Sequence, residues 1–359
     1  MFAVYGLWTP PAEHGGTPRY YRADGSPCHA ASGANAVGYV DKDPYSLDAF
    51  REESGVAAGQ CFESLKEAIE ATGPEAVLNT TALPGHTPVT KAALDAGLHV
   101  LVEKPFASSL AEAQVMADYA AVRARVLMVS QNYRFFPAPR VIAAMIHESD
   151  LGELYQVSID FRRYSARGVG GARRHHLEEQ PLLVDMSIHH FDLLRLILSR
   201  EPQRVYCEAW NPGWTVFSGP PVAIASAVFE GGVVVSYRGS WISAAPVTPW
   251  AGEWRMEFEN GEVTWSSAAD SDPTQDRVAI RLRGAEERTL ELPAMARTGI
   301  PAALAEFASA IREDREPETS GRRNLGTIAF MEAAVESAAR REAVRVRPTG
   351  EATGAAAAL

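Results

Sequence analysis

A charged pair, Glu103 and Lys104, stands directly after the short apolar run Val100–Val102, with Pro105 next and no turn residues between. Such a run is typical of a strand that is buried on both faces. Charged side chains are expensive to bury unless something pairs with them. We therefore interpret Lys104 as lying where the strand leaves the core and enters a cleft. An ammonium group in a cleft can stabilise negative charge on a bound molecule.

A second set of chemically versatile residues is a group of histidines with one aspartate further along the chain. Histidine exchanges protons near neutral pH and binds metal ions. The spacings match no His-x-x-x-His motif with a downstream acidic ligand, so we predict no metal and treat a metal-dependent enzyme as a less favoured alternative. We expect His190 to be structural. The group is His175, His176, Asp185, His189 and His190.

Composition limits the classes of protein that need to be considered. The chain has 359 residues, 46% hydrophobic and 22% charged, which is ordinary for a globular protein of two domains. A net charge of −11 argues against nucleic acid as a partner. No apolar run is long enough to span a membrane, no signal peptide is evident, and the three cysteines are scattered. We expect a cytoplasmic protein.

From about residue 36 to residue 135 the chain alternates strand and helix, which predicts a parallel sheet with helices on both faces. We expect helices over 43–55, from a capping box at Ser64 and Glu67 to Gly73, from Pro88 to Gly97, and over 109–124. Ligands of such sheets bind beyond the carboxyl ends of the strands. The residues predicted on that edge are Asp41, Thr80, Thr81, Glu103, Lys104 and Asn132.

After residue 151 the pattern changes to strands with alternating apolar and polar residues, separated by the turns "EGGV" and "ENGE". These strands predict a large, mostly antiparallel sheet with one covered face, and a helix pair closes the fold. The tryptophans of "SWISAAPVTPWAGEWRM" either stack on a sugar or, by default, belong to the sheet core or a subunit interface. We predict domains at 1–128 (with an atypical 1–35) and 129–346, and a loose tail at 347–359.

The segments "AGLHVLVEKPFASSLAEA" and "VDMSIHHFDLLRLIL", with a strand ending at Asp41 before them, resemble the Gfo/Idh/MocA oxidoreductases. This family includes glucose–fructose oxidoreductase, inositol dehydrogenase and many sugar-active relatives. The resemblance runs from about residue 36 to about residue 346. It implies an α/β fold, with an N-terminal Rossmann-like doubly wound parallel sheet and a C-terminal α+β domain containing a large open sheet.

The resemblance implies hydride transfer between a nicotinamide and a sugar or polyol carbon, with Lys104, Asp185 and His189 as the catalytic residues. His189 would take the hydroxyl proton, Lys104 would stabilise the alkoxide, and Asp185 would orient the ring and the substrate. Tyr133 and Arg134 would bind substrate beside these three, although Arg134 could instead form an ion pair that joins the domains.

The implied cofactor is NAD, with NADP possible. Asp41 can accept hydrogen bonds from the ribose hydroxyls, whereas the neighbouring Lys42 could attract a 2′-phosphate. Glu103 would either accept hydrogen bonds near the cofactor or pair with a neighbouring base. The predicted cofactor-binding residues are Gly15, Gly16, Asp41, Lys42, Thr80, Thr81, His86, Glu103, Lys104 and Asn132.

The N-terminal segment departs from the family pattern. Relatives begin with a strand that runs into Gly-x-Gly-x-x-Gly. Counting back about 25 residues from Asp41 reaches "EHGGTPRYYRADGSPCHAASG", which contains Gly15 and Gly16 but no such fingerprint. The segment binds phosphate in an unusual way, or is not a cofactor loop, or is a misread or frame-shifted version of a normal one.

Two functional hypotheses follow. The first is an NAD(P)-dependent sugar or polyol oxidoreductase, which the Lys104, Asp185 and His189 pattern favours. The second is a catalytically silent relative that binds sugar or serves as a scaffold, which the missing glycines favour. We also predict a homodimer or homotetramer. Association would use the open sheet face, where we expect large aromatic and aliphatic residues on both faces of "VVVSYRGSWIS" and "EWRMEFENGEVTW".

Overall fold

The computed structural model describes residues 2–5, 35–146, 151–165, 176–268 and 273–349. The described residues form two compact units. The first extends to Asn132 and also includes Ile300–Leu325, while the second runs from Tyr133 to Gly299 and resumes at Gly326. No helix among the described residues combines the length and the apolar character needed to cross a membrane.

The first unit contains a six-stranded sheet in the order β3-β2-β1-β4-β5-β6, with every neighbouring pair parallel. This is the order of a doubly wound dinucleotide-binding fold. The apolar residues of β4, β5 and β6 are almost completely buried, as expected for strands covered on both faces. The strands are β1 (Phe2–Tyr5), β2 (Ala36–Val40), β3 (Cys61–Phe62), β4 (Ala76–Asn79), β5 (His99–Val102) and β6 (Leu127–Val129).

The position of β1 differs from the sequence-based expectation. The family pattern predicts the first strand about 25 residues before Asp41, but it lies at Phe2–Tyr5, in the centre of the sheet between β2 and β4. Residues 6–34 follow it. The predicted cofactor residues Gly15 and Gly16 therefore lie outside the described residues.

Local capping signals in the sequence predicted two helix starts of the first unit, at Asp43 and at Ser64, and the structure adds a third cap of this kind at Ser109. Ser64 accepts a hydrogen bond from the Glu67 amide, and Ser109 accepts one from the Glu112 amide. Each cap of this kind stabilises a helix by about 1 kcal/mol. The helices are α1 (Pro44–Ser54), η2 (Ala58–Gln60), α2 (Leu65–Thr72), α3 (Leu83–Asp95), α4 (Leu110–Val122) and α7 (Gly299–Arg312).

Helix α3 begins at Leu83, five residues before the predicted start at Pro88. Pro84 occupies the first turn, where its missing N–H is harmless, whereas Pro88 lies inside the helix and removes one hydrogen bond. The prediction was wrong because it assigned the first-turn position to the second proline. The earlier start brings His86 into the helix.

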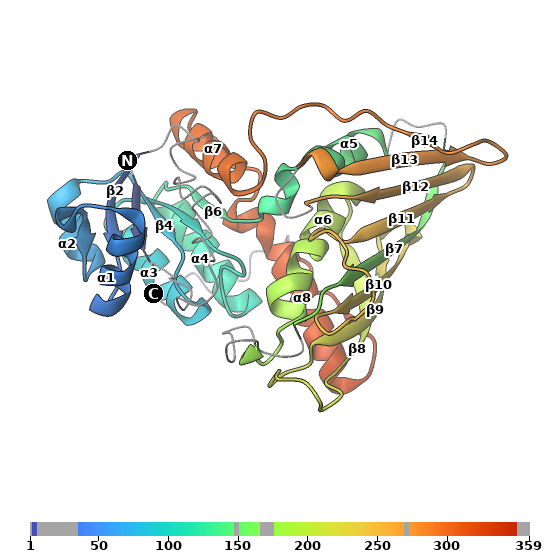
Figure 1. Ribbon diagram of the computed structural model, residues 1–359, viewed down its shortest axis with the longest axis horizontal. Helices are drawn as coiled ribbons and strands as arrows, with labels where there is room; N and C mark the ends of the chain where they lie inside the picture. The colour runs from blue at the N-terminus through green and yellow to red at the C-terminus, as the bar shows by residue number, and fades with distance from the viewer. Residues whose placement is uncertain (1, 6–34, 147–150, 166–175, 269–272, 350–359) are drawn as a thin grey trace. The chain divides into compact units, whose positions relative to one another are not determined.

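The second unit contains a nine-stranded sheet in the order β14-β13-β12-β11-β7-β10-β9-β8-β15 (Figure 1). Among the described strand pairs of this sheet, β7 with β10 is parallel and the others are antiparallel. The strands are β7 (Leu154–Arg162), β8 (Pro202–Trp210), β9 (Val222–Phe229), β10 (Val234–Ser240), β11 (Glu253–Phe258), β12 (Gly261–Ser266), β13 (Arg277–Leu282), β14 (Arg288–Thr289) and β15 (Val344–Arg345).

Helices α6 and α8 lie against one face of this sheet (Figure 1). The Phe191 ring of α6 packs against Tyr237 of β10, and Phe330 of α8 packs edge-on against Phe229 of β9. The helical segments of this unit are η3 (Asn132–Phe135), α5 (Pro137–Met145), the π-helical turn η5 (Leu183–Ser187), α6 (Ile188–Leu198), η6 (Glu230–Gly232), η7 (Pro273–Gln275) and α8 (Gly321–Arg340).

The two faces of the large sheet differ in polarity, which corrects the expectation of apolar residues on both. Trp254 and Trp265 are stacked and buried on the helix-covered face, as the default interpretation of these tryptophans predicted. The residues that alternate with them, such as Arg255 and Glu262, form an ion pair. A strand has a side-chain period of two, so the helix-covered face takes most of the large apolar residues, and the outer face is mainly charged and polar with a few exposed aliphatic side chains such as Ile224 and Val234.

Candidate active site

Lys104 lies immediately beyond β5, at the carboxyl edge of the parallel sheet. Val100, Leu101 and Val102 are completely buried, and Lys104 retains only 6% of its exposed surface. The Lys104 amide donates to the Glu103 carboxylate at 3.2 Å, so the acid shapes the backbone of the same loop. The structure thus places Glu103 and Lys104 at the edge where ligands of such sheets bind.

His86 joins the two loops that follow β4 and β5. Its Nδ1 lies 2.7 Å from the Pro105 carbonyl and its Nε2 lies 2.9 Å from the Thr81 carbonyl. Both partners are acceptors, so a neutral ring donates to only one of them. Burial lowers the pKa of His86, and the two carbonyl groups oppose that shift. His86 is 2% exposed, and its polar atoms are directed to the protein backbone.

Asn79, the last residue of β4, holds the loop after β4 through hydrogen bonds of its side-chain amide. Its amide nitrogen donates to the His86 carbonyl at 2.9 Å and to the Thr90 hydroxyl at 3.2 Å. Its amide oxygen accepts from the amide and the hydroxyl of Thr81. Asn79 is fully buried, and every polar group it carries is paired. Thr80 and Thr81, the next two residues, are partly exposed.

Asp41 and Lys42 follow β2 at the same edge of the sheet. The Asp41 carboxylate accepts the Asp43 amide at 3.0 Å, which holds the loop into α1. Asp41 is partly exposed and Lys42 is exposed, so both side chains are accessible to a ligand.

Asp185 and His189 belong to the second unit, at the start of the helical stretch that covers the large sheet. Asp185 lies in the π-helical turn η5, whose Ser187 amide bonds to the Leu182 carbonyl at 2.8 Å, and His189 lies in the first turn of α6. Such π-turns occur frequently at functional sites. Asp185 is partly exposed, whereas His189 is 6% exposed.

Tyr133 packs on the imidazole of His189. The two ring centroids are 4.2 Å apart and the planes differ by 16°, which is a stacked arrangement. Stacking of this kind restricts rotation of the imidazole. Tyr133 was predicted as a substrate-binding residue, and its contact with His189 supports a position beside the proposed base.

Arg134 makes a two-pronged ion pair with Asp192. Arg134 Nε and Nη2 lie 2.5 and 2.8 Å from the two carboxylate oxygens, and the Thr327 hydroxyl also donates to Asp192 at 3.1 Å. The side chains are 12% and 2% exposed. Asp192 lies three residues after His189 on α6, so this pair fixes the helix that carries His189. The ion pair expected as the alternative role of Arg134 is therefore present, but the expectation that it joins the domains was wrong, because both partners belong to the second unit.

His190 is directed away from His189 into a buried hydrogen-bond chain, which confirms that it is a structural residue. Ser187 donates to the Tyr237 hydroxyl, which faces His190 Nδ1 at 3.1 Å, and His190 Nε2 lies 3.0 Å from the Trp250 carbonyl. Complete burial lowers the pKa of His190 to about 4. A neutral ring satisfies both contacts, with Nε2 donating and Nδ1 accepting.

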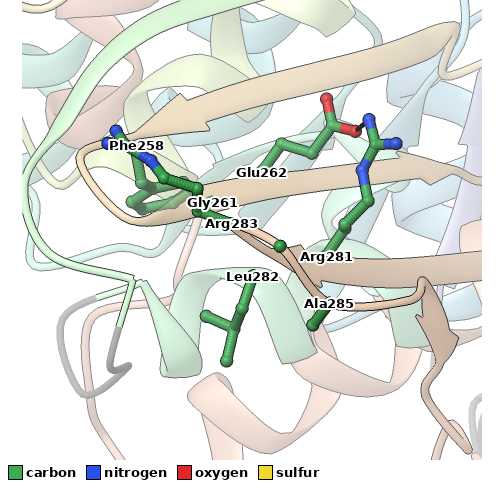
Figure 2. A pocket seen from close by; sticks show the side chains of 8 residues that line it. Phe258, Gly261, Glu262, Arg281, Leu282, Arg283 and Ala285 are labelled. Atoms are coloured by element: carbon green, nitrogen blue, oxygen red, sulfur yellow. Dashed lines mark hydrogen bonds and ion pairs between the residues drawn. The ribbon is translucent and has the colours of Figure 1, made fainter.

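The remaining polar cluster and an open hollow on the second unit's sheet do not contain the predicted catalytic residues. Among the residues that the structure describes, no group of three His, Cys, Asp or Glu side chains could hold a metal ion. His176 is buried beside Ser165, and His175 lies outside the described residues. An open hollow at the β12–β13 hairpin is bordered by the Glu262–Arg281 ion pair (Figure 2).

The parallel sheet with polar groups along its carboxyl edge, together with a separate α+β unit, defines a two-domain protein with a dinucleotide-binding type of fold. The chain belongs to the GFO/IDH/MocA family: residues 16–131 match its oxidoreductase domain with an NAD-binding Rossmann fold, and residues 140–264 match its C-terminal domain. The first unit is accordingly the NAD-binding domain.

Known relatives cover most of the chain at low identity. An uncharacterized protein of Sinorhizobium fredii is 29% identical over 66% of each chain. D-apiose dehydrogenase of Paraburkholderia graminis is 27% identical over 85% of this chain and 81% of its own. The fold matches an inositol dehydrogenase homologue of Azotobacter vinelandii, solved with NADH and myo-inositol, with a TM-score of 0.78, 22% identity and coverage of 96% and 97%.

The described residues of the first unit fit a dinucleotide. Asp41 is an accessible acid at the carboxyl end of β2, where it can accept from ribose hydroxyls. Gln131, two residues beyond β6, is 1% exposed, and neither atom of its amide has a hydrogen-bond partner among the described residues. Its amide, unpaired among the described residues, stands at the edge of the sheet where ligands of such folds bind.

Sequence reasoning missed Asn79 and Gln131. Both stand where an apolar run ends, in "AVLN" and "LMVSQ", the same signal that identified Lys104. The sequence analysis applied that signal to charged residues, to Thr80 and Thr81 and to Asn132, and passed over the neighbouring amide side chains Asn79 and Gln131.

Proposed function

We propose that the protein is an NAD-dependent oxidoreductase that interconverts a CH–OH and a C=O group on a sugar or polyol. The observation that carries this proposal is the buried Lys104 at the carboxyl edge of an NAD-binding sheet, in a chain that also has Asp185 and His189 four residues apart. A sugar substrate is supported by relatives such as D-apiose dehydrogenase.

In this proposal a bound nicotinamide would supply the hydride acceptor for oxidation of the substrate carbon, or the hydride donor for the reverse reaction. His189 takes the hydroxyl proton on a ring nitrogen, and Lys104 stabilises the negative charge that develops on the oxygen. Asp185 orients the substrate hydroxyls, and Tyr133 holds the His189 ring by stacking. Arg134, which the sequence analysis also proposed as a substrate contact, positions α6 through Asp192.

Binding of NADH and NADPH tests the cofactor assignment directly. We expect NADH to bind more tightly, because the Asp41 carboxylate accepts from the ribose hydroxyls and repels a 2′-phosphate. Nicotinamide fluorescence during titration gives both dissociation constants, and Lys42→Ala is the matched control because it removes the competing cation. Tighter binding of NADPH by the wild-type protein would show that Lys42 outweighs Asp41.

The second candidate function is a catalytically silent sugar-binding or scaffold protein. The observation that favours it is the absence of Gly-x-Gly-x-x-Gly after β1, where residues 6–34 contain only Gly6, Gly15, Gly16, Gly25 and Gly33 at other spacings. Wild-type protein that binds neither nucleotide, and that reduces no NAD with a panel of aldoses and inositols, would establish this alternative.

We further propose that the protein is a homodimer or homotetramer that associates through the outer face of the nine-stranded sheet. This face has exposed aliphatic residues, Ile224 at 45% and Val234 at 41%. Ile224 is paired with Arg238, which forms an ion pair with Asp160. Two copies related by a two-fold axis can match such a mixed surface against itself.

Light scattering at micromolar concentration should give at least twice the 38.8 kDa of one chain. Arg238→Glu places a second negative charge beside Asp160 and should shift the mass toward one chain. A wild-type mass near 38.8 kDa would contradict the association.

A further inference from the structure

Two buried amide side chains at the carboxyl edge of the first unit's sheet differ completely in their pairing. Asn79, at the end of β4, is 0% exposed, and its amide contacts His86, Thr90 and Thr81. Gln131, beyond β6, is 1% exposed, and both Nε2 and Oε1 lack a hydrogen-bond partner among the described residues. Folded proteins rarely leave both ends of a buried amide unpaired, because burial removes the water that would otherwise bind them.

The position of Gln131 relates it to Lys104. Strands β5 and β6 pair with Val102 opposite Val129, and the Ser130 amide donates to the Val102 carbonyl at 2.8 Å. Lys104 and Gln131 each lie two residues beyond that register pair. Gln131 and the proposed catalytic lysine therefore follow neighbouring strands and lie equally far beyond the strand ends.

The backbone conformation at Gln131 allows its side chain to be directed toward the carboxyl edge of the sheet. The Gln131 amide N–H bonds back to the Val129 carbonyl at 2.8 Å, so the chain turns directly after β6. A glutamine side chain has rotatable χ torsions, and a change of rotamer can move its amide without moving the strand. Among the described residues the amide has no hydrogen-bond partner, and such a change can bring it to a polar group of a bound ligand.

We propose that Gln131 is a ligand-binding residue whose amide is left unpaired in the unliganded protein and is satisfied by the bound reactants. The group it binds carries both a donor and an acceptor, which is the chemistry of the nicotinamide carboxamide and of a substrate hydroxyl. This inference rests on the proposed function, because it requires a nicotinamide or its substrate beside Lys104.

Gln131→Met tests the proposal because methionine keeps the length and volume of glutamine and removes its donor and acceptor. In the absence of ligand, we expect the midpoint of thermal unfolding to stay the same or to rise by up to about 4 °C, since an unpaired buried amide has been removed. Asn79→Leu is the matched control and should lower the midpoint, because it leaves the Thr81 and Thr90 groups unpaired. If Asn79→Leu does not fold, Thr90→Val serves as the control instead, because it removes one of the hydrogen bonds of Asn79.

Ligand binding is measured on the same Gln131→Met protein. If the partner is the carboxamide, the dissociation constant for NADH should rise at least about tenfold, as expected for a ligand group left unpaired. If the partner is a substrate hydroxyl, NADH should bind normally and the substrate KM should rise at least about tenfold. Either result supports the proposal.

Three outcomes would overturn it. Gln131→Met that unfolds at a lower temperature, as Asn79→Leu is expected to, would show that the amide is already satisfied without ligand. Unchanged NADH binding and unchanged substrate KM would remove the ligand role while leaving the proposed function intact. Wild-type protein that binds neither NADH nor NADPH would overturn the proposed function and this inference with it.

Discussion

Lys104→Ala and His189→Ala should each reduce turnover of a sugar or polyol substrate by about 10²–10⁴-fold, the usual contribution of acid–base help at a reacting oxygen. Lys104→Ala removes the charge that stabilises the alkoxide. His189→Ala removes the group that takes the hydroxyl proton. We expect the loss in kcat, with a smaller change in KM, because both groups act mainly on the charge that develops during reaction.

Stability measurements separate this loss of activity from damage to the fold. Lys104 lies at the edge of the sheet, so its removal should change the unfolding midpoint little. His189→Ala loses the stacking contact with Tyr133, and His189→Asn is a second variant that keeps a polar group there. Lys66→Ala, an exposed helix lysine 3.8 Å from Glu70, is the control and should keep full turnover. Normal turnover in both Lys104→Ala and His189→Ala would contradict the catalytic assignment.

The first unit was largely predictable because its signals are local. The run Val100–Val102 indicated a buried strand, and Ser64 with Glu67 indicated a helix start. Neither inference needs any knowledge of residues far away in the chain. The side chains at the strand ends could be placed on one edge because parallel strands share a direction.

Features that depend on distant residues were not predictable. Arg134 was assigned two possible roles because nothing in its neighbourhood identifies Asp192, 58 residues later, as its partner. The outer face of the large sheet was misjudged because the alternation was not followed strand by strand. The first strand was missed because the chain between β1 and β2 is longer than in the expected pattern.

The lysine and histidine proposed for catalysis were identified from a motif, but the groups that hold them were not. The bridge from His86 to Pro105 and Thr81 joins residues that no short motif contains. Tyr133 and His189 are likewise stacked through tertiary packing. The sequence therefore indicated the reacting groups, whereas their supporting contacts became known only from the fold.

The Arg134–Asp192 pair supports the second expected result, a large loss of stability when either partner is removed alone. Arg134→Met or Asp192→Leu should lower the free energy of unfolding by about 3–5 kcal/mol, because each leaves one buried charge without its partner. Urea denaturation, followed through the unfolding transition of the second unit, gives the free energy of unfolding of each variant. Asp192 lies on the same helix as His189, whereas Arg134 lies in η3. Activity should therefore fall as well, and Asp192→Leu should lose more activity than its loss of stability explains.

The double variant Arg134→Met with Asp192→Leu decides whether the loss comes from the unpaired charge. If it does, the double variant should be more stable than either single variant, because both charges are gone and apolar groups fill a similar volume. Arg134→Lys should not rescue the pair, since an ammonium cannot reproduce the two parallel hydrogen bonds. Thr327→Val, which removes only the third hydrogen bond to Asp192, should cost about 1 kcal/mol. Additive losses in the double variant would show that Arg134 and Asp192 act independently, and that the pair does not hold α6 in place.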